Sequence, residues 1–303
     1  MLRSFLLYLS ERESPKKLIM GNALGRRLAS RFIAGEEFSD ALRVIRKLNS
    51  EGFMVTLDCL GESVREAAAA EAACQTYLQL LDRLAEEQLN SHVSVKLTQL
   101  GLAIDEALAR KNLARIAEKA ARHHNFVRVD MEGSAFTDAT LRVLCSVDAP
   151  REVVGIAIQA YLRRTPADVA EILQRGVRIR LVKGAYKEPP DIAFAKKSEV
   201  DEQFQKLAET LLDSGIYHAI ATHDERIIAA AERFAQAQGI GPHSFEFQLL
   251  YGIRRDLQRA LLQRGWRVRL YVPFGREWYA YFMRRLAERP ANLSFLIRNL
   301  VRQ

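Results

Sequence analysis

Short runs of apolar and β-branched residues recur along the chain, and each is followed by a longer stretch with helical spacing of its apolar positions. The short runs predict strands, and the longer stretches, such as residues 65–89 and 224–239, predict amphipathic helices. The predicted strands are residues 53–58, 92–97, 126–131, 153–159, 177–182, 218–222, 244–248 and 267–272. Because strands that alternate with helices pair in parallel through right-handed crossovers, the pattern predicts an α/β fold.

Eight strand–helix units in about 250 residues close most simply into a (β/α)8 barrel of the TIM type. The alternative is an open, doubly wound sheet, which usually carries a glycine-rich turn after its first strand. Here that turn reads LGES (residues 60–63) and lacks the GxGxxG pattern. The first fifty residues read as helices. We therefore expect an N-terminal helical segment (1–50) that packs on a barrel formed by residues 51–303, in a single domain overall.

Composition and charge limit the kinds of partner. Three widely spaced cysteines without a CxxC pair indicate neither a zinc site nor a disulfide framework, and fit a reducing cytosol. The apolar patch FLLYL near the N-terminus is too short to span a bilayer. A net charge of +8 suggests anionic partners, but 45 basic residues are interleaved with 37 acidic ones. This mixture favours a solvated surface over a nucleic-acid footprint.

Polar residues stand near the carboxyl end of every predicted strand, where a barrel of this type carries its active site. Charged residues are rarely buried without a partner, so a set of this size must pair within itself or with a ligand. Each residue alone would also be typical of a solvated loop. The set is Asp58, Glu62, Lys96, Asp130, Glu132, Gln159, Arg180, Lys183, Gly184, Tyr186, Thr222, His223, Asp224, Glu246, Gln248 and Tyr271.

Two familiar chemistries lack their patterns in this sequence. The six histidines form no HxH or HExxH spacing, so we expect no metal site. There is no GxSxG motif and no cysteine–histidine pairing that would indicate nucleophilic hydrolysis.

Two adjacent arginines, Arg284 and Arg285, follow the aromatic run WYAYF in a helix predicted from about residue 276 to 289. An ordinary i,i+4 pair of Arg284 with Glu288, worth a few tenths of a kcal/mol, is one interpretation. Guanidinium groups also bind carboxylates in bidentate geometry. Together with Lys96 and nearby tyrosines, the two arginines would then form a cage for a small anion with an apolar body.

Several segments together resemble the proline dehydrogenase family, flavoenzymes with a distorted (β/α)8 barrel. The segments are RFIAGE (31–36), SVKLTQLG (94–101), RLVKGAY (180–186), FEFQLLYGI (245–253) and YVPFGREWYAYFMRRLAE (271–288). The resemblance extends from about residue 29 to 299, and the chain length is similar to that of the stand-alone bacterial members. It implies FAD-dependent oxidation of L-proline to Δ1-pyrroline-5-carboxylate, the first step of proline catabolism to glutamate, by hydride transfer from proline C5 to flavin N5.

The resemblance also implies roles for individual residues. Asp130 and Arg180 would be catalytic: Arg180 places a positive charge near the reactive flavin nitrogen, and Asp130 orients Lys96. The substrate would be bound by Lys96, Tyr186, Tyr271, Arg284, Arg285 and Glu62, the last of which would close the site by pairing with Arg284. The flavin would be bound by Met131, Gln159, Arg180, Lys183, Gly184, Ala185, Thr222 and His223.

The same resemblance implies a membrane quinone as electron acceptor and pyrroline-5-carboxylate dehydrogenase as a partner. It places the protein in the cytoplasm, with peripheral association at the inner face of the cytoplasmic membrane. Two alternatives stay open: another flavin-dependent barrel oxidoreductase that acts on a small carboxylate, and a basic nucleic-acid-binding barrel. We expect no nucleic acid, because the aromatic residues cluster beside the paired arginines instead of interleaving with a basic stripe. The sequence does not indicate the oligomeric state.

Overall fold

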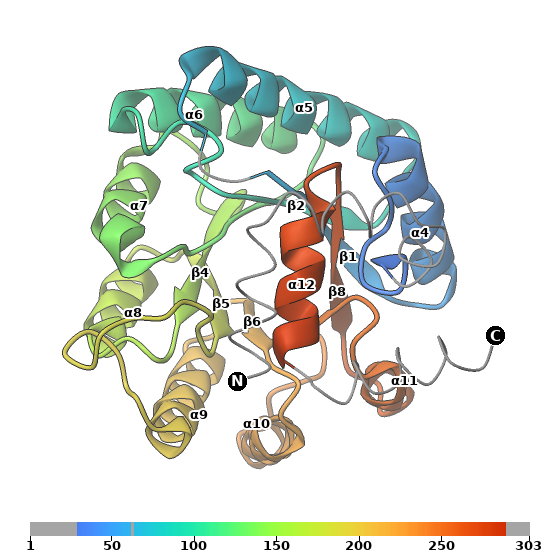
Figure 1. Ribbon diagram of the computed structural model, residues 1–303. Helices are drawn as coiled ribbons and strands as arrows, with labels where there is room; N and C mark the ends of the chain where they lie inside the picture. Colours follow the sequence, from blue (N-terminus) through green and yellow to red (C-terminus); the bar gives the residue numbers. More distant parts are fainter. Residues whose placement is uncertain (1–28, 62–63, 289–303) are drawn as a thin grey trace.

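The computed structural model describes residues 29–61 and 64–288 of the 303-residue chain, with only the backbone described for residues 286–288 (Figure 1). The FLLYL patch and Glu62 lie outside the described residues, so the predictions made for them stay predictions. The division into an N-terminal segment (1–50) and a barrel (51–303) also stays a prediction.

Eight parallel strands form a closed barrel in chain order, which confirms the predicted fold and makes the open sheet wrong. The barrel closes where β8 pairs with β1, with Tyr271 opposite Thr56. The strands are β1 (Met54–Cys59), β2 (Ser91–Val95), β3 (Val127–Val129), β4 (Val154–Gln159), β5 (Arg178–Val182), β6 (His218–Ala221), β7 (Phe245–Leu250) and β8 (Val268–Phe274).

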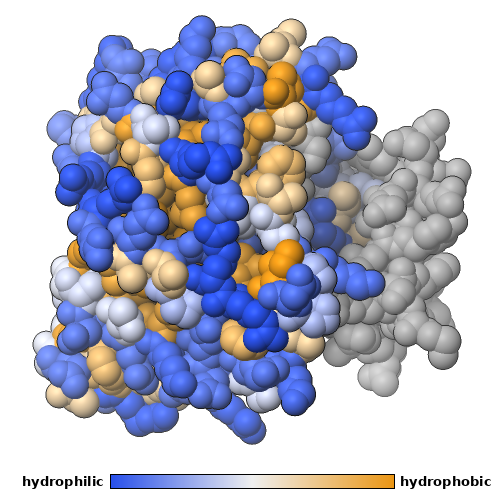
Figure 2. Space-filling view, turned by 90° about the vertical axis from the view of Figure 1, so that its left-hand side faces the viewer, coloured by the Kyte–Doolittle hydropathy of each residue, from blue (hydrophilic) through white to orange (hydrophobic). Residues whose placement is uncertain are grey.

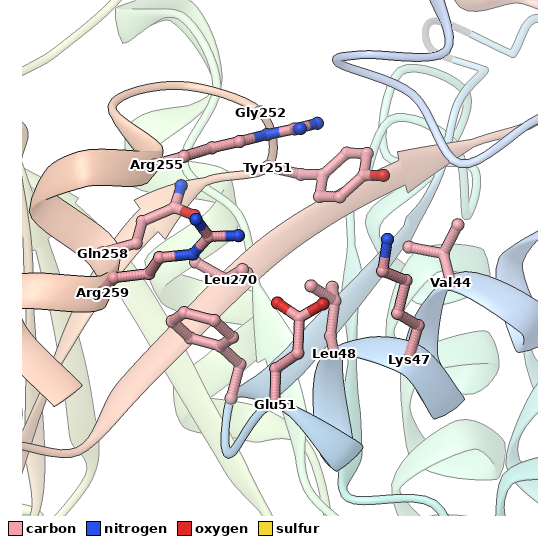
Figure 3. Close-up of a pocket in the computed structure, with 11 residues that line it drawn as sticks. Val44, Lys47, Leu48, Glu51, Tyr251, Gly252, Arg255, Gln258, Arg259 and Leu270 are labelled. Carbon is pink, nitrogen blue, oxygen red and sulfur yellow. The ribbon is translucent and has the colours of Figure 1, made fainter. Parts of the chain in front are cut away.

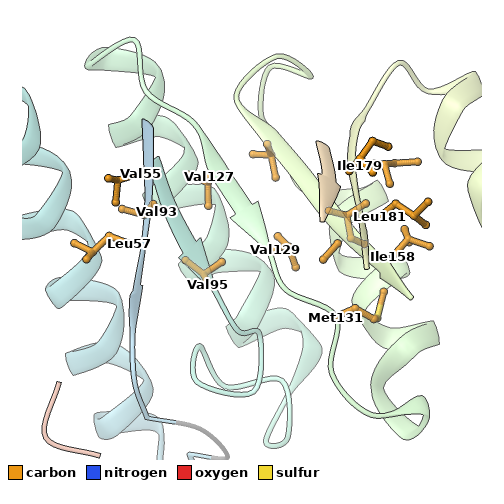
Figure 4. Packing of buried hydrophobic residues seen from close by; sticks show 14 of the residues in the cluster. Val55, Leu57, Val93, Val95, Val127, Val129, Met131, Ile158, Ile179 and Leu181 are labelled. Atoms are coloured by element: carbon orange, nitrogen blue, oxygen red, sulfur yellow. The ribbon is translucent and has the colours of Figure 1, made fainter. Parts of the chain in front are cut away.

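Alternating side chains along the strands separate an apolar layer from a polar interior. The apolar positions, for example Val55 and Leu57 of β1, are fully buried in the main hydrophobic core together with residues of the surrounding helices. Figure 4 shows this layer, with Val93, Val95, Val127, Val129, Ile179 and Leu181 among its members. The intervening positions of β1, Thr56 and Asp58, are equally buried but polar.

Helices follow the strands and surround the barrel (Figure 1). They are α5 (Ala67–Glu86), α6 (Glu106–Arg122), α7 (Ser134–Ser146), α8 (Thr165–Gln174), α9 (Lys197–Asp213), α10 (Glu225–Ala237), α11 (Arg255–Gln263) and α12 (Trp278–Glu288), with α4 (Phe38–Ser50) ahead of β1. The stretches predicted as helices at 65–89 and 224–239 are α5 and α10. No described helix has the length and apolar character that crossing a membrane requires.

Helix α4 takes the place beside β8 and β1 that the last helix of a regular barrel would occupy. It contacts both strands, and its Leu42, Ile45 and Leu48 belong to the main core. Helix α12 lies in front of the strands instead (Figure 1). The distortion of the barrel is therefore an exchange in position: α4 takes the place of the last helix, and α12 lies in front of the strands.

A second, smaller apolar cluster fixes α12 over the carboxyl ends of the strands. It joins Tyr279 and Phe282 of α12 to Phe32, and to Leu60 and Ile253 in the loops that follow β1 and β7. The segment RFIAGE (31–36), which is far from α12 in the sequence, supports this contact. The backbone N–H of Ala34 donates to the carbonyl of Pro273 at 2.9 Å, and the indole N–H of Trp278 donates to Glu36 at 2.8 Å.

The outer surface is of mixed character. The face on the side of α7 and α8 is mostly hydrophilic, with apolar residues in narrow areas between the charged ones (Figure 2). A hollow with a volume of about 70 Å³ lies between α4 and α11, where Lys47, Glu51, Arg255 and Arg259 surround Tyr251 (Figure 3). These cations and the carboxylate are exposed, and none of the residues that line the hollow is a predicted site residue.

We predict that Phe282→Ala loosens α12 without unfolding the barrel. Phe282 is 2% exposed and packs against the rings of Phe32 and Trp278. Losing a buried phenylalanine costs about 3–5 kcal/mol, and here the loss falls on the smaller cluster. Amide hydrogen exchange should become faster in α12 by at least about tenfold while the barrel strands stay protected.

The matched control is Phe204→Ala in α9, a fully buried ring of the main core. It should speed exchange throughout the barrel. Equal acceleration of α12 and the strands by Phe282→Ala would mean that the two clusters do not unfold separately.

Candidate active site

A buried group of polar side chains lies at the carboxyl end of the barrel. Five strands supply it, because each contributes a residue, either within the strand or directly after it, that points to the same interior. Five of the six members are at most 8% exposed. The members are Asp58 (β1), Ser94 and Lys96 (β2 and just after it), Asp130 (just after β3), Arg180 (β5) and Tyr271 (β8).

The carboxylate of Asp130 is the centre of this group. One oxygen accepts hydrogen bonds from the Ser94 hydroxyl at 2.5 Å and from the Arg180 guanidinium. The other accepts a hydrogen bond from the Tyr271 hydroxyl at 2.8 Å, and the Lys96 ammonium lies 3.7 Å from it. Burial alone would raise the pKa of Asp130, but the attraction of Arg180 and Lys96 and the hydrogen bonds outweigh it and lower the pKa. Asp130 is therefore an ionised carboxylate.

Asp58 is the second carboxylate of the group and is 1% exposed. It accepts a hydrogen bond from the Lys96 ammonium at 2.8 Å, which is shorter than the distance from Lys96 to Asp130. Burial raises the pKa of Asp58 in spite of the attraction of Lys96, and the negative charge of Asp130 adds to the increase. The two carboxylates therefore differ in their affinity for a proton.

Tyr271 and Arg180 pack against each other above Asp130. The guanidinium carbon of Arg180 lies 5.3 Å from the centre of the Tyr271 ring, within cation–π distance. Burial, together with the charges of Asp130 and Asp58, raises the pKa of Tyr271 well above its usual value, so its hydroxyl stays protonated and donates. Nε and Nη1 of Arg180 are buried without a hydrogen-bond partner among the described residues.

Gln159 and the RLVKGAY loop meet next to this group. Gln159, at the end of β4, donates to the backbone carbonyl of Glu132 at 2.8 Å and accepts from the N–H of Ala185 at 3.4 Å. Gly184 has a φ of +123°, and a Cβ atom there would lie 2.2 Å from the ring of Tyr161. A glycine is thus required here by the backbone and by a neighbouring side chain, a reason that differs from the predicted approach of a cofactor.

Three further residues predicted to bind the cofactor have protein partners. Lys183 pairs with Asp201 at 2.5 Å and with Asp224 at 2.8 Å. The hydroxyl of Thr222 accepts from the backbone N–H of Asp224 at 3.1 Å. Nε2 of His223 accepts from the backbone N–H of Leu250 at 3.1 Å. These contacts join the ends of β5, β6 and β7, so the residues form the rim of the barrel mouth.

The remaining predicted residues that the structure describes lie around the carboxyl end of the barrel, and all of them except Met131 are more exposed than Asp130. Arg284 and Arg285 are half-buried on α12, and Arg285 lies over the ring of Tyr281. Tyr186 is 40% exposed in the loop after β5, and Met131, next to Asp130, is 8% exposed. The structure thus brings Lys96, Asp130, Arg180 and Tyr271 into contact and places both arginines on the helix that covers the same end. The partner proposed for Arg284, Glu62, lies outside the described residues, as does the side chain of Glu288.

Asp58 had no predicted role of its own, and Ser94 was not among the predicted site residues. The register of β1 and β2 brings these residues together, since Asp58 pairs with Ser94 and Lys96 lies two residues further on the same face. The sequence alone does not give this register. Within residues 29–61 and 64–288, no group of three or more His, Cys, Asp or Glu side chains is placed to hold a metal ion.

The closed parallel barrel with an ionic site at its carboxyl end defines a barrel enzyme, and the comparisons with known proteins give its family. The family model of proline dehydrogenase matches residues 41–298. Proline dehydrogenase 2 of Bacillus subtilis (strain 168) is 40% identical over 99% of both chains. The proline dehydrogenase of Deinococcus radiodurans is 40% identical over 91% of this chain and 90% of its own. The chain therefore belongs to the proline dehydrogenase family.

A solved structure agrees with this assignment. The crystal structure of proline utilization A (PutA) from Bdellovibrio bacteriovorus, inactivated by N-propargylglycine, has a TM-score of 0.81 and 28% sequence identity. The match covers 87% of this chain and 33% of that one, so the chain corresponds to about a third of PutA. The chain is thus an oxidoreductase that oxidises proline in proline catabolism.

We predict that Asp224→Asn removes an acid-sensitive part of the stability. Burial favours the neutral carboxyl, but the hydrogen bonds and charges of Lys183 and Lys197 lower the pKa of Asp224 to about 2. A carboxyl with a depressed folded-state pKa stabilises the fold above its unfolded pKa, and this stabilisation is lost as pH falls from about 4 to about 2. The free energy of unfolding of the variant should be lower by about 2 kcal/mol at pH 7.

Urea denaturation at a series of pH values measures this difference, which should vanish near pH 2. Asp213→Asn, at the exposed end of α9, is the control and should change the free energy of unfolding by less than about 0.5 kcal/mol. A difference between Asp224→Asn and the parent protein that is independent of pH would contradict the role of the charge.

Proposed function

We propose that the chain is a FAD-dependent proline dehydrogenase that converts L-proline to Δ1-pyrroline-5-carboxylate. The observation that carries the proposal is the buried Lys96–Asp130–Arg180–Tyr271 group, which lies at the barrel end covered by the helix of Arg284 and Arg285. It combines cations for a carboxylate, an aromatic ring for an apolar body, and unsatisfied donors for an acceptor-rich cofactor.

The carboxylate of proline would be bound by Lys96, Arg284 and Arg285. Asp58 and Asp130 pair with Lys96 and Arg180, and Arg284 and Arg285 lie on the helix over the same end of the barrel. A lysine ammonium has three hydrogens, so Lys96 can keep its hydrogen bond to Asp58 and still donate to a substrate. Bidentate arginine contacts would add orientation.

The pyrrolidine ring would lie against Tyr271 and Tyr186. Asp130 fixes the hydroxyl of Tyr271, so its ring has a defined orientation. Tyr186, at 40% exposure, has surface to bury when a substrate binds. Glu62 would close the site by pairing with Arg284.

The residues at the barrel end fit a flavin. Nε and Nη1 of Arg180 are buried donors without a partner among the described residues, and the acceptor atoms of a flavin ring would satisfy them. We propose that Met131, Gln159, Arg180, Gly184 and Ala185 hold the ring, and that Lys183, Thr222 and His223 belong to the rim of the cofactor site. FAD, when bound, accepts the hydride that leaves proline C5.

The protein residues supply orientation and electrostatics. The positive charge of Arg180 would favour an electron-rich cofactor ring. Asp130 has a lowered pKa and is therefore a weak base, so we assign it the fixing of Arg180, Tyr271 and Lys96 and no abstraction of a proton. The amine of proline would react as the free base.

The electrons and the product must leave the site. We propose a membrane quinone as the electron acceptor, reached from the cytoplasm by peripheral association, which the net charge of +8 would favour at an anionic membrane surface. We also propose that pyrroline-5-carboxylate dehydrogenase takes the product. A relative described as bifunctional, the protein PutA of Escherichia coli, supports this proposal. It is 28% identical over 90% of this chain and 24% of its own length.

The purified protein with added FAD should show a flavin absorption band near ~450 nm that L-proline bleaches without oxygen, while D-proline does not. Arg284→Met and Arg285→Met should each raise the KM for proline by about ten- to a hundredfold, since a hydrogen bond to a charged group is worth about 1.5–3 kcal/mol. The flavin spectrum should be retained in both. Titration with proline under nitrogen measures these effects.

Arg255→Met, an exposed arginine on α11, is the control and should leave the KM unchanged. A protein that binds no flavin would refute the cofactor assignment. A flavin that L-proline does not reduce would refute the substrate chemistry while leaving the fold unaffected.

A further inference from the structure

We propose that Asp58 is a positioning residue of the carboxylate site, which holds the Lys96 ammonium where the substrate carboxylate is received. The inference rests on the proposed function, since it requires Lys96 to bind the substrate. Asp58 would act through Lys96 and would not itself touch the substrate.

Distances and competition among donors favour Asp58 over Asp130 as the residue that holds Lys96. The Lys96 ammonium lies 2.8 Å from the Asp58 carboxylate and 3.7 Å from that of Asp130. Asp130 is already occupied by the Ser94 hydroxyl, Arg180 and the Tyr271 hydroxyl. Asp58 accepts a hydrogen bond from Lys96, and the Tyr271 hydroxyl also lies near it.

Two paired strands position these residues, since Asp58 lies within β1 and Lys96 directly follows β2. Asp58 lies within β1 and is in register with Ser94 of β2, and Lys96 follows two residues later on the same interior face. Both side chains are enclosed, at 1% exposure for Asp58 and 7% for Lys96. A site residue held by packed strands keeps its geometry better than one on a mobile segment.

Loss of the Asp58 charge would change the position of Lys96. A buried ammonium needs a counter-charge, and Asp130 would be the nearest one left. Lys96 would then be drawn toward Asp130 and would compete with Arg180 and Tyr271 for the same oxygens. Its hydrogens would be diverted from a substrate carboxylate, and binding of that carboxylate would weaken.

A purely structural role is the competing explanation, because breaking any buried ion pair destabilises a protein. The two explanations differ in what they predict for ligands. A positioning role affects ligands with a carboxylate and depends on Lys96. A structural role affects stability and all ligands alike.

The experiment uses the FAD-loaded protein and two proline-like ligands that have no amine: cyclopentanecarboxylate and its neutral counterpart, cyclopentanecarboxamide. Binding is followed by the change in the flavin spectrum, and steady-state oxidation of proline is measured in parallel. The variants are Asp58→Asn, Lys96→Met and the double variant.

Asp58→Asn should raise the Kd of cyclopentanecarboxylate and the KM of proline by about tenfold or more, with the Kd of the carboxamide and kcat changed less than about threefold. In the Lys96→Met background, adding Asp58→Asn should change the carboxylate Kd by less than about twofold, because residues that act as one unit are not additive.

Glu246→Gln is the matched control. Glu246 is another buried barrel carboxylate, 2% exposed, and is bound to Arg269 at 2.8 Å. Glu246→Gln should lower the melting temperature and leave the ratio of carboxylate to carboxamide affinity unchanged. Should Asp58→Asn alone fail to fold, the double variant, in which both charges are removed, is compared with Lys96→Met.

An unchanged affinity ratio in Asp58→Asn would overturn the inference, as would a more than about twofold effect of Asp58→Asn in the Lys96→Met background. If Lys96→Met itself leaves the carboxylate Kd unchanged, the proposed role of Lys96 fails, and this inference fails with it. If Lys96→Met weakens binding of the carboxylate and Asp58→Asn leaves it unchanged, only the inference about Asp58 is refuted.

Discussion

Charge neutralisation inside the barrel is the constraint on which the site depends. The carboxylate of Asp130 binds Arg180 directly and lies within ion-pair distance of Lys96, while Asp58 binds Lys96 from the other side. None of these four groups could be buried alone at an acceptable cost. Their burial in one group is what makes a charged barrel interior compatible with a folded protein.

The polar interior extends below the site toward the base of the barrel. A regular barrel of this class fills its interior with apolar layers. Here Arg128 is 4% exposed and donates to the backbone carbonyls of Ile156 and Arg178. Burial lowers its pKa to about 9. Gly155 makes room for it, since a Cβ there would lie 2.6 Å from the Arg128 guanidinium.

Much of this arrangement followed from local sequence patterns. Short runs of apolar and β-branched residues located the strands. The position of a residue at a predicted strand end then placed Lys96, Asp130 and Tyr271 in one region, because parallel strands of a closed barrel end on the same side. The resemblance implied that the barrel is distorted, but it did not indicate that α4 and α12 exchange positions.

What could not be predicted depends on distances between side chains of different elements. No local pattern tells that Lys96 lies nearer to Asp58 than to Asp130, or that Lys183 pairs with Asp201 at the start of α9. The packing of Tyr161 against Gly184 is of the same kind. The place of α4 beside β8 and β1 also escaped prediction, because it depends on packing between segments that are far apart in the sequence.

The exchange of α4 and α12 has a consequence for the order in which the chain can assemble during synthesis. Helix α4 precedes β1, so it is available before any strand of the barrel has been made. The outer ring of helices is then complete as soon as β8 pairs with β1, without waiting for α12. Because domains fold as they are synthesised, the barrel and its buried charges can form first. The helix with the paired arginines is added last, as a cover for an interior that is already built.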